Sequence, residues 1–102
     1  MSEPLKAAFI FIAPEGDPAE HRQWVKTKQI HLLAVAVSDY AQAEGVARQL
    51  VEDEGIGAIE LCGGFGSAGT ARVAASVDVP VGVVRFDQHP GLGNVSGDTL
   101  FS

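Results

Sequence analysis

The sequence predicts an α/β fold, a small three-layer structure in which helices cover both faces of a parallel sheet, with the element order βαβαβαβ. Three observations predict it. Four apolar runs spaced along 102 residues have the length and composition of buried strands. Segments with helix-capping residues or helical spacing separate the runs, and helical crossovers join parallel strands. The length suits one core, so we expect a single domain over residues 1–102.

The first strand is predicted over Lys6 to Ala13, an aromatic and β-branched run without polar alternation. Asp17, Pro18 and Glu20 follow it and supply an N-cap, a proline at the first helical position and an acid at the third. These residues predict a first helix that continues to about Thr27.

The second strand is predicted over Ile30 to Val37. Asp39 and Gln42 come next with the spacing of a capping box, and apolar residues then recur at helical spacing. Gly55 stands where a left-handed C-cap residue belongs. We therefore predict the longest helix between Asp39 and Gly55.

Two more strands are predicted over Ala58 to Cys62 and Val81 to Phe86, with a short helix from Ser67 to about Val77 between them. We expect the order 2-1-3-4, numbering strands along the chain, because it places the first strand centrally; a half-barrel in the order 1-2-3-4 is the alternative. Asp87 to Ser102 is rich in glycine and proline but ends on an apolar pair, so we expect an ordered C-terminal wrap.

Composition limits the partners. Seven Lys and Arg against 13 Asp and Glu give a net charge of −6. This charge argues against a nucleic-acid partner, because nucleic-acid binding depends on clustered Lys and Arg. No apolar run approaches the roughly 20 residues of a membrane span, and the initial Met-Ser-Glu-Pro lacks the order of a signal peptide, so we expect a cytoplasmic protein. One helix would lie alone on its face of the sheet, so we expect a homo-oligomer to cover it.

The carboxyl ends of the strands predict the site, because ligands of open parallel sheets bind beyond them. Glu15 follows the first strand there. Backbone N–H groups of a glycine-rich loop after the third strand, aided by the helix dipole, would bind phosphate or carboxylate. The loop consists of Gly63, Gly64, Phe65, Gly66 and Ser67. The alternative is that its glycines only permit a tight turn and close packing of the following helix.

Gly64, Gly66 and Gly69 also match the dinucleotide-binding pattern G-x-G-x-x-G, and Asp87 ends the next strand near where a ribose-binding acid would fall. The pattern lies in the second half of a short chain, and only a tail follows the fourth strand. Most of a dinucleotide fold is therefore missing, and nucleotide binding is the alternative function.

Glu60 lies inside an apolar strand and needs a partner if it is buried. Arg85, near the end of the next strand, is the expected partner. Such a pair would either fix the strand register or orient a ligand. Arg85 could equally present its planar guanidinium to a substrate carboxylate or phosphate.

Three residues are candidates for catalysis. Cys62, the one cysteine, ends a strand beside the glycine amides, where a thiolate is favoured, although a lone cysteine is commonly a small buried apolar residue. Asp87 and His89 have a spacing that lets the carboxylate orient the imidazole. Asp87 and His89 are also candidate metal ligands, but two ligands do not make a metal site, so we predict no metal. The cofactor and the reaction stay open.

Three motifs carry a resemblance that spans nearly the whole chain. They are KAAFIFIAPEGDP at residues 6–18, IELCGGFG at 59–66 and VGVVRFD with HPG at 81–91. Because these motifs occur in this order and context, the sequence resembles a family of short bacterial proteins classed as a domain of unknown function. The resemblance implies a bacterial, single-domain protein and no particular activity. Three functions follow from the residues: handling of a small anionic metabolite, nucleotide binding, or a non-catalytic assembly module.

Overall fold

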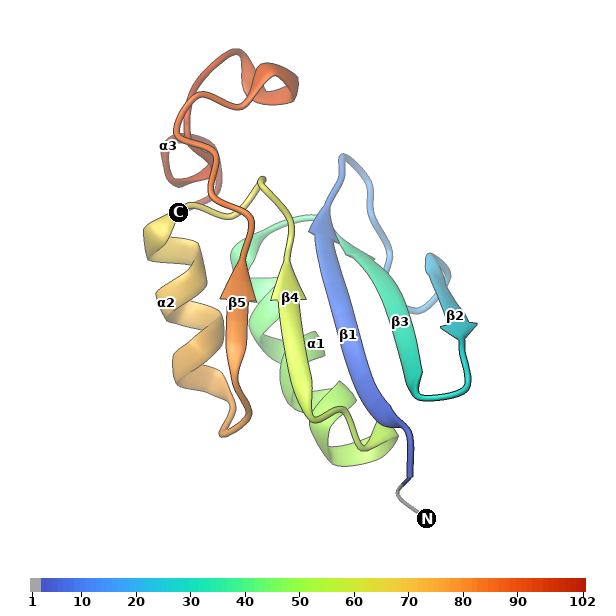
Figure 1. Cartoon of the computed structure of the whole chain (residues 1–102). Coiled ribbons are helices and arrows are strands. Elements are labelled where there is room, and N and C mark those ends of the chain that lie inside the picture. The colour runs from blue at the N-terminus through green and yellow to red at the C-terminus, as the bar shows by residue number, and fades with distance from the viewer. Residues whose placement is uncertain (1–2) are drawn as a thin grey trace.

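The protein is an α/β structure, as the sequence predicts, and its sheet has five strands and is mostly parallel (Figure 1). The computed structural model describes residues 3–102, so Met1 and Ser2, which enter the signal-peptide expectation, lie outside it. The strands are β1 (Leu5–Ile12), β2 (Arg22–Lys26), β3 (Ile30–Val37), β4 (Ala58–Leu61) and β5 (Val81–Val83). The helices are α1 (Tyr40–Glu54), α2 (Ser67–Ser76), the 3-10 turn η1 (Pro90–Leu92) and α3 (Gly97–Phe101).

The sheet order is β2-β3-β1-β4-β5. The four predicted strands are β1, β3, β4 and β5; they are all parallel and lie in the predicted order 2-1-3-4, so the half-barrel alternative is wrong. Strand β1 is central, with Ala8 paired to Leu33 on one side and to Ile59 on the other. The sheet therefore brings the ends of β4 and β5 side by side.

The helix predicted from Asp17 to Thr27 is wrong. Asp17 does cap a turn, because its carboxylate accepts a hydrogen bond from the Ala19 N–H at 3.0 Å. The chain then extends into β2, which pairs antiparallel with β3 and forms an edge of the sheet. Trp24, which packs against the core, and its β-branched neighbour Val25 suit a strand better than a helix. Tertiary pairing overrode the local capping signal.

The expected three layers are reduced to two. Helices α1 and α2 contact each other and pack on one face of the sheet (Figure 1). Their core contains the fully buried side chains of Ile10, Leu33, Leu50, Ile59 and Val73. The missing first helix was the element expected on the opposite face. That face consequently remains without a helical layer in the described chain.

Helix α1 has both predicted caps. The Asp39 carboxylate accepts a hydrogen bond from the Gln42 N–H at 2.8 Å, and the Gln42 side chain accepts one from the Ser38 N–H at 2.7 Å. Gly55 closes the helix with a φ of 72°. Helix α1 thus begins with the fully buried Tyr40, at the end of the sheet where α2 also begins.

The C-terminal segment turns back over that end of the molecule (Figure 1). Its Phe101 packs against the core, with its ring 5.9 Å from the Tyr40 ring. Helix α3 is thereby brought beside α2. Within residues 3–102, no helix is both long and apolar enough to cross a membrane.

Candidate functional site

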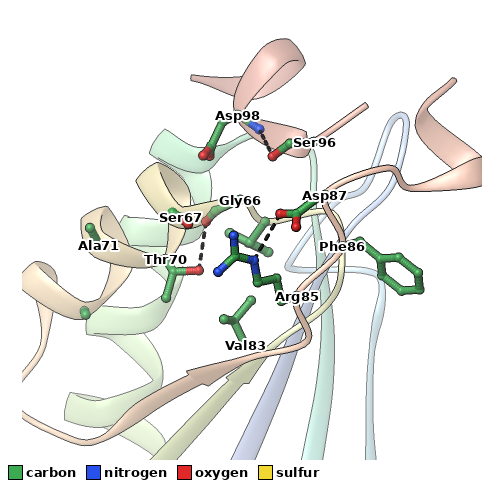
Figure 2. Close-up of a pocket in the computed structure, with 12 residues that line it drawn as sticks. Gly66, Ser67, Thr70, Ala71, Val83, Arg85, Phe86, Asp87, Ser96 and Asp98 are labelled. Carbon is green, nitrogen blue, oxygen red and sulfur yellow. Dashed lines mark hydrogen bonds and ion pairs between the residues drawn. The ribbon is translucent and has the colours of Figure 1, made fainter. Parts of the chain in front are cut away.

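A cavity of about 580 Å³ lies between α2 and the chain that follows β5 (Figure 2). The volume falls within the range of small-molecule sites, roughly 300 to 1,000 Å³. Apolar groups form most of its walls, and a few polar side chains stand among them. The lining residues are Phe65, Gly66, Ser67, Thr70, Ala71, Ala74, Val83, Arg85, Phe86, Asp87, Ser96 and Asp98.

Helix α2 and the end of β5, with the chain that follows it, build the walls. On α2, Ser67, Thr70, Ala71 and Ala74 recur every three or four residues and therefore share one side of the helix. Across from them lies Val83, at which β5 ends rather than at the predicted Phe86, and the irregular chain that follows adds Arg85, Phe86 and Asp87. The cavity is thus apolar at Ala71 and Ala74, and its polar groups gather at the first turn of α2 and beyond the end of β5.

Arg85 is the one cation among the lining residues. Its Nε donates a hydrogen bond to the Asp87 carboxylate at 3.0 Å, and both side chains are about three-quarters exposed. Figure 2 shows the guanidinium directed toward the first turn of α2, between Thr70 and Asp87. Within residues 3–102 its two terminal nitrogens donate no hydrogen bond, so they are free to bind an anion.

The N-terminus of α2, where the sequence predicts a bound anion, holds a carboxylate of the chain itself. Asp98 accepts hydrogen bonds from the N–H groups of Ala68 at 3.0 Å and Gly69 at 3.2 Å. Tyr40 donates its hydroxyl to the same carboxylate at 3.0 Å. An external anion at these amides would have to displace Asp98, so the free anion-binding groups of the cavity are those of Arg85.

These hydrogen bonds change the pKa of both partners. Burial raises the pKa of the Tyr40 hydroxyl to about 12, and its hydrogen bond to the Asp98 carboxylate acts in the same direction. For Asp98, burial by itself would raise the pKa, but donation from Ala68, Gly69 and Tyr40 holds it below its ordinary value. A protonated tyrosine and an ionised aspartate are therefore the stable pair at neutral pH.

Tyr40 is the single tyrosine of the chain, so its titration can be followed directly. We expect tyrosinate absorbance to appear with a midpoint near pH 12 in the folded protein and near the ordinary value of 10 in denaturant. A raised pKa favours the protonated hydroxyl, so this contribution to stability is complete below pH 10 and is lost as the pH rises toward 12. A single midpoint near 10 in the folded state would contradict the arrangement.

The glycines of the loop, and Gly69 of α2, have packing roles. A Cβ atom at Gly63 would overlap the Phe86 ring, one at Gly66 the Asp98 carboxylate, and one at Gly69 the Tyr40 ring. Close approach of neighbouring atoms therefore explains why glycine stands at these positions. The neighbours are side chains of α1 and of the chain after β5. The Gly66 N–H donates to the Tyr40 hydroxyl at 3.0 Å, which leaves that amide satisfied inside the protein.

Two of the three predicted catalytic residues are not among the residues that line the cavity. The Cys62 sulfur accepts hydrogen bonds from the N–H groups of Ile12 at 3.3 Å and Gly64 at 3.2 Å. The His89 ring packs against Phe86 at a tilt of 55°, with ring centroids 4.6 Å apart, and its Nδ1 accepts a hydrogen bond from the Gly91 N–H at 3.0 Å. The expected pairing of Asp87 with His89 is wrong, because Asp87 pairs with Arg85 instead.

The predicted pair of Glu60 and Arg85 is also wrong. Glu60 is exposed and lies opposite Gly82 in the pairing of β4 with β5. Glu60 alternates with the buried Ile59 and Leu61 and therefore points away from the helices, whereas Arg85 lies beyond the end of β5 and lines the cavity beside α2. Glu15 is exposed in the turn after β1, with a φ of 60°, and does not line the cavity. Of the predicted ligand-binding residues, the lining includes Phe65, Gly66, Ser67 and Arg85.

The sequence reasoning missed the α2 wall and the C-terminal residues. The spacing of Thr70, Ala71 and Ala74 on a predicted helix was a usable signal for that wall. Ser96 and Asp98 had no such signal, because only the folding back of the last segment brings them to the cavity. Among the described residues, no cluster of three or more His, Cys, Asp or Glu could hold a metal ion.

Comparison with known proteins gives one match. A family model described as a family of unknown function (DUF6506) matches residues 5–99. Searches of curated proteins and of solved structures find no match.

Proposed function

The chain belongs to DUF6506, a family of unknown function, and from its own geometry we propose that it binds a small carboxylate- or phosphate-bearing molecule with an apolar body. The cavity beside α2 is the proposed site. The observation that carries the proposal is a guanidinium with free terminal nitrogens at the mouth of a largely apolar cavity. Binding sites of this size combine apolar walls with a few directed polar groups.

Arg85 would bind the anionic group. Its Nε is already held by Asp87, so the terminal edge of the guanidinium faces the cavity and can donate two parallel hydrogen bonds to a carboxylate or phosphate. The exposed pair of Arg85 and Asp87 contributes little to stability by itself. Asp87 is therefore best understood as a positioning residue for Arg85.

The apolar body of the ligand would lie along α2. Ala71, Ala74 and Val83 present small apolar groups there, and Phe65 lies at the inner wall. Val83 is 38% exposed, so a ligand that covers it removes apolar surface from water. Ser67 and Thr70 offer hydroxyl groups near the guanidinium for a further polar contact.

The proposal is one of binding, and catalytic roles for Cys62, Asp87 and His89 stay predictions. Among these three, Asp87 alone lines the cavity. A cytoplasmic location belongs to the same proposal and rests on the sequence. The negative net charge of −6 favours a small ligand over nucleic acid as the source of the anionic group.

Three probes with one apolar chain test the site: hexanoate, hexyl phosphate and hexanol. We expect hexanoate or hexyl phosphate to raise the melting temperature, since a ligand at 100 times its Kd stabilises by about 2.7 kcal/mol. Hexanol should bind much more weakly because it cannot pair with Arg85. Equal responses to all three probes would overturn the assignment of an anion site.

Arg85→Lys should weaken binding of the responding probe roughly tenfold or more, because the charge remains but the planar two-donor edge is lost. Arg85→Ala should weaken it further. Arg48→Ala, which removes an exposed arginine of α1 outside the cavity, is the matched control and should leave the affinity unchanged. Titration calorimetry measures all four proteins; unchanged affinity in Arg85→Ala would contradict the proposal.

A further inference from the structure

We propose that the sheet face opposite α1 and α2 is the interface with a second copy of this chain. We call this surface the open face; it comprises the strand side chains that point away from the two helices. Strand pairing defines it, because Ala7, Phe9 and Phe11 of β1 alternate with the core residues Ala8 and Ile10. The inference is independent of the ligand proposed for the cavity.

The open face is apolar across several strands. Leu5, Val25 and Ile30 belong to it by register and are 50%, 57% and 48% exposed. Phe9 and Phe11 continue the apolar surface along β1 and are only partly buried. Among the described strand residues of this face, Glu60 alone is charged. A surface of this composition is typical of a protein interface.

The open face carries both a ridge and a hollow, which suits a contact with a second copy. Phe9 and Phe11 stack along β1 with ring centroids 6.4 Å apart and form a ridge. On the neighbouring strand β3, the direct partner of Phe9 is Ala34, a small and partly exposed residue that lines a hollow beside the ridge. In a two-fold dimer the ridge of each copy can occupy the hollow of the other, so one surface supplies both halves of the contact. This complementarity favours a second copy over an unrelated partner.

The area of the open face agrees with that of a dimer interface. Each strand residue covers about 3.3 Å along the strand and 4.8 Å across it, so the open face has a flat area of about 450 Å² per copy. Two copies therefore contribute about 900 Å² before the relief of the side chains is added, close to the roughly 1,000 Å² that a specific interface requires.

Sedimentation velocity of the full chain tests the proposal with a matched pair of variants. Leu5→Glu places a charge on the open face, and Leu100→Glu places the same charge on α3, at a leucine that is 54% exposed. We expect the wild type and Leu100→Glu to sediment as dimers at micromolar concentration. Leu5→Glu should raise the dissociation constant roughly 100-fold or more, because the charge would be desolvated at the interface.

Val25→Glu, on the edge strand, is a second variant on the same face and should have the same effect. Circular dichroism and the melting temperature establish that each variant is folded, which we expect because both side chains lie outside the core. A wild type that remains monomeric at about 100 μM would overturn the proposal. So would a dimer that both open-face variants leave intact, or one that Leu100→Glu dissociates equally.

Discussion

Gly69→Ala should lower the free energy of unfolding by about 2 to 3 kcal/mol, the cost typical of overpacking a core. A Cβ atom at this position would overlap the ring of Tyr40. Tyr40 is fully buried and stacks on Phe65 with ring centroids 5.4 Å apart, so it cannot move aside without disturbing the core. Urea denaturation of the variant and the wild type measures the difference.

Gly45→Ala is the control, because Gly45 is also a helical glycine. The nearest atom to a Cβ there is an Arg48 side-chain nitrogen at 4.0 Å, so alanine fits without displacement. Helix propensity then stabilises the variant by up to about 1 kcal/mol. The two substitutions are thus expected to have opposite signs. Stabilisation by both would show that Tyr40 does not require a glycine at position 69.

Asp98→Ala should also lower the free energy of unfolding by about 2 to 3 kcal/mol, because it removes the acceptor of several hydrogen bonds at once. The N–H groups of Ala68 and Gly69 would lose their partner at the start of α2, and the buried Tyr40 hydroxyl would lose its acceptor. Asp98→Asn keeps one acceptor oxygen and should cost less. Equal stability of wild type and Asp98→Ala would contradict this role.

The pH dependence of the same variant gives a second measurement. Folding lowers the pKa of Asp98 below its ordinary value of 3.8. The contribution of Asp98 to stability is therefore complete above pH 3.8 and declines as the pH falls toward the lower pKa of the folded state. The difference in unfolding free energy between wild type and Asp98→Ala should therefore shrink on acidification below pH 3.8. A difference that is constant over that range would exclude the ionised carboxylate as its source.

The elements that the sequence predicts correctly are those whose signal is local. Continuous apolar runs predict β1, β3, β4 and β5, and Asp39 and Gly55 predict the ends of α1. The region from Asp17 to Lys26 was misassigned because capping residues and strand-forming residues are adjacent there. Pairing with the exposed edge of β3 decided between them, and pairing is not visible in a local pattern.

The residues of the candidate site also divide into those that the sequence places correctly and those that it does not. Arg85 and the first turn of α2 could be placed from the sequence, because the carboxyl ends of parallel strands meet at one end of a sheet. The pairing of Glu60 with Arg85 failed because Glu60 points away from the helices, whereas Arg85 lies beyond the end of β5 and lines the cavity beside α2. That error came from assuming burial for an acid inside an apolar strand.

The sequence alone determined the class of fold, the four parallel strands and the end of the sheet where the cavity lies, because each follows from patterns of neighbouring residues. The order of those strands had a half-barrel alternative, which only the tertiary structure excluded. Tertiary structure decided what occupies the N-terminus of α2 and which face of the sheet stays uncovered. Asp98 reaches Tyr40 across 58 residues of chain. Contacts between residues so far apart depend on how the finished elements pack, and no local pattern encodes them.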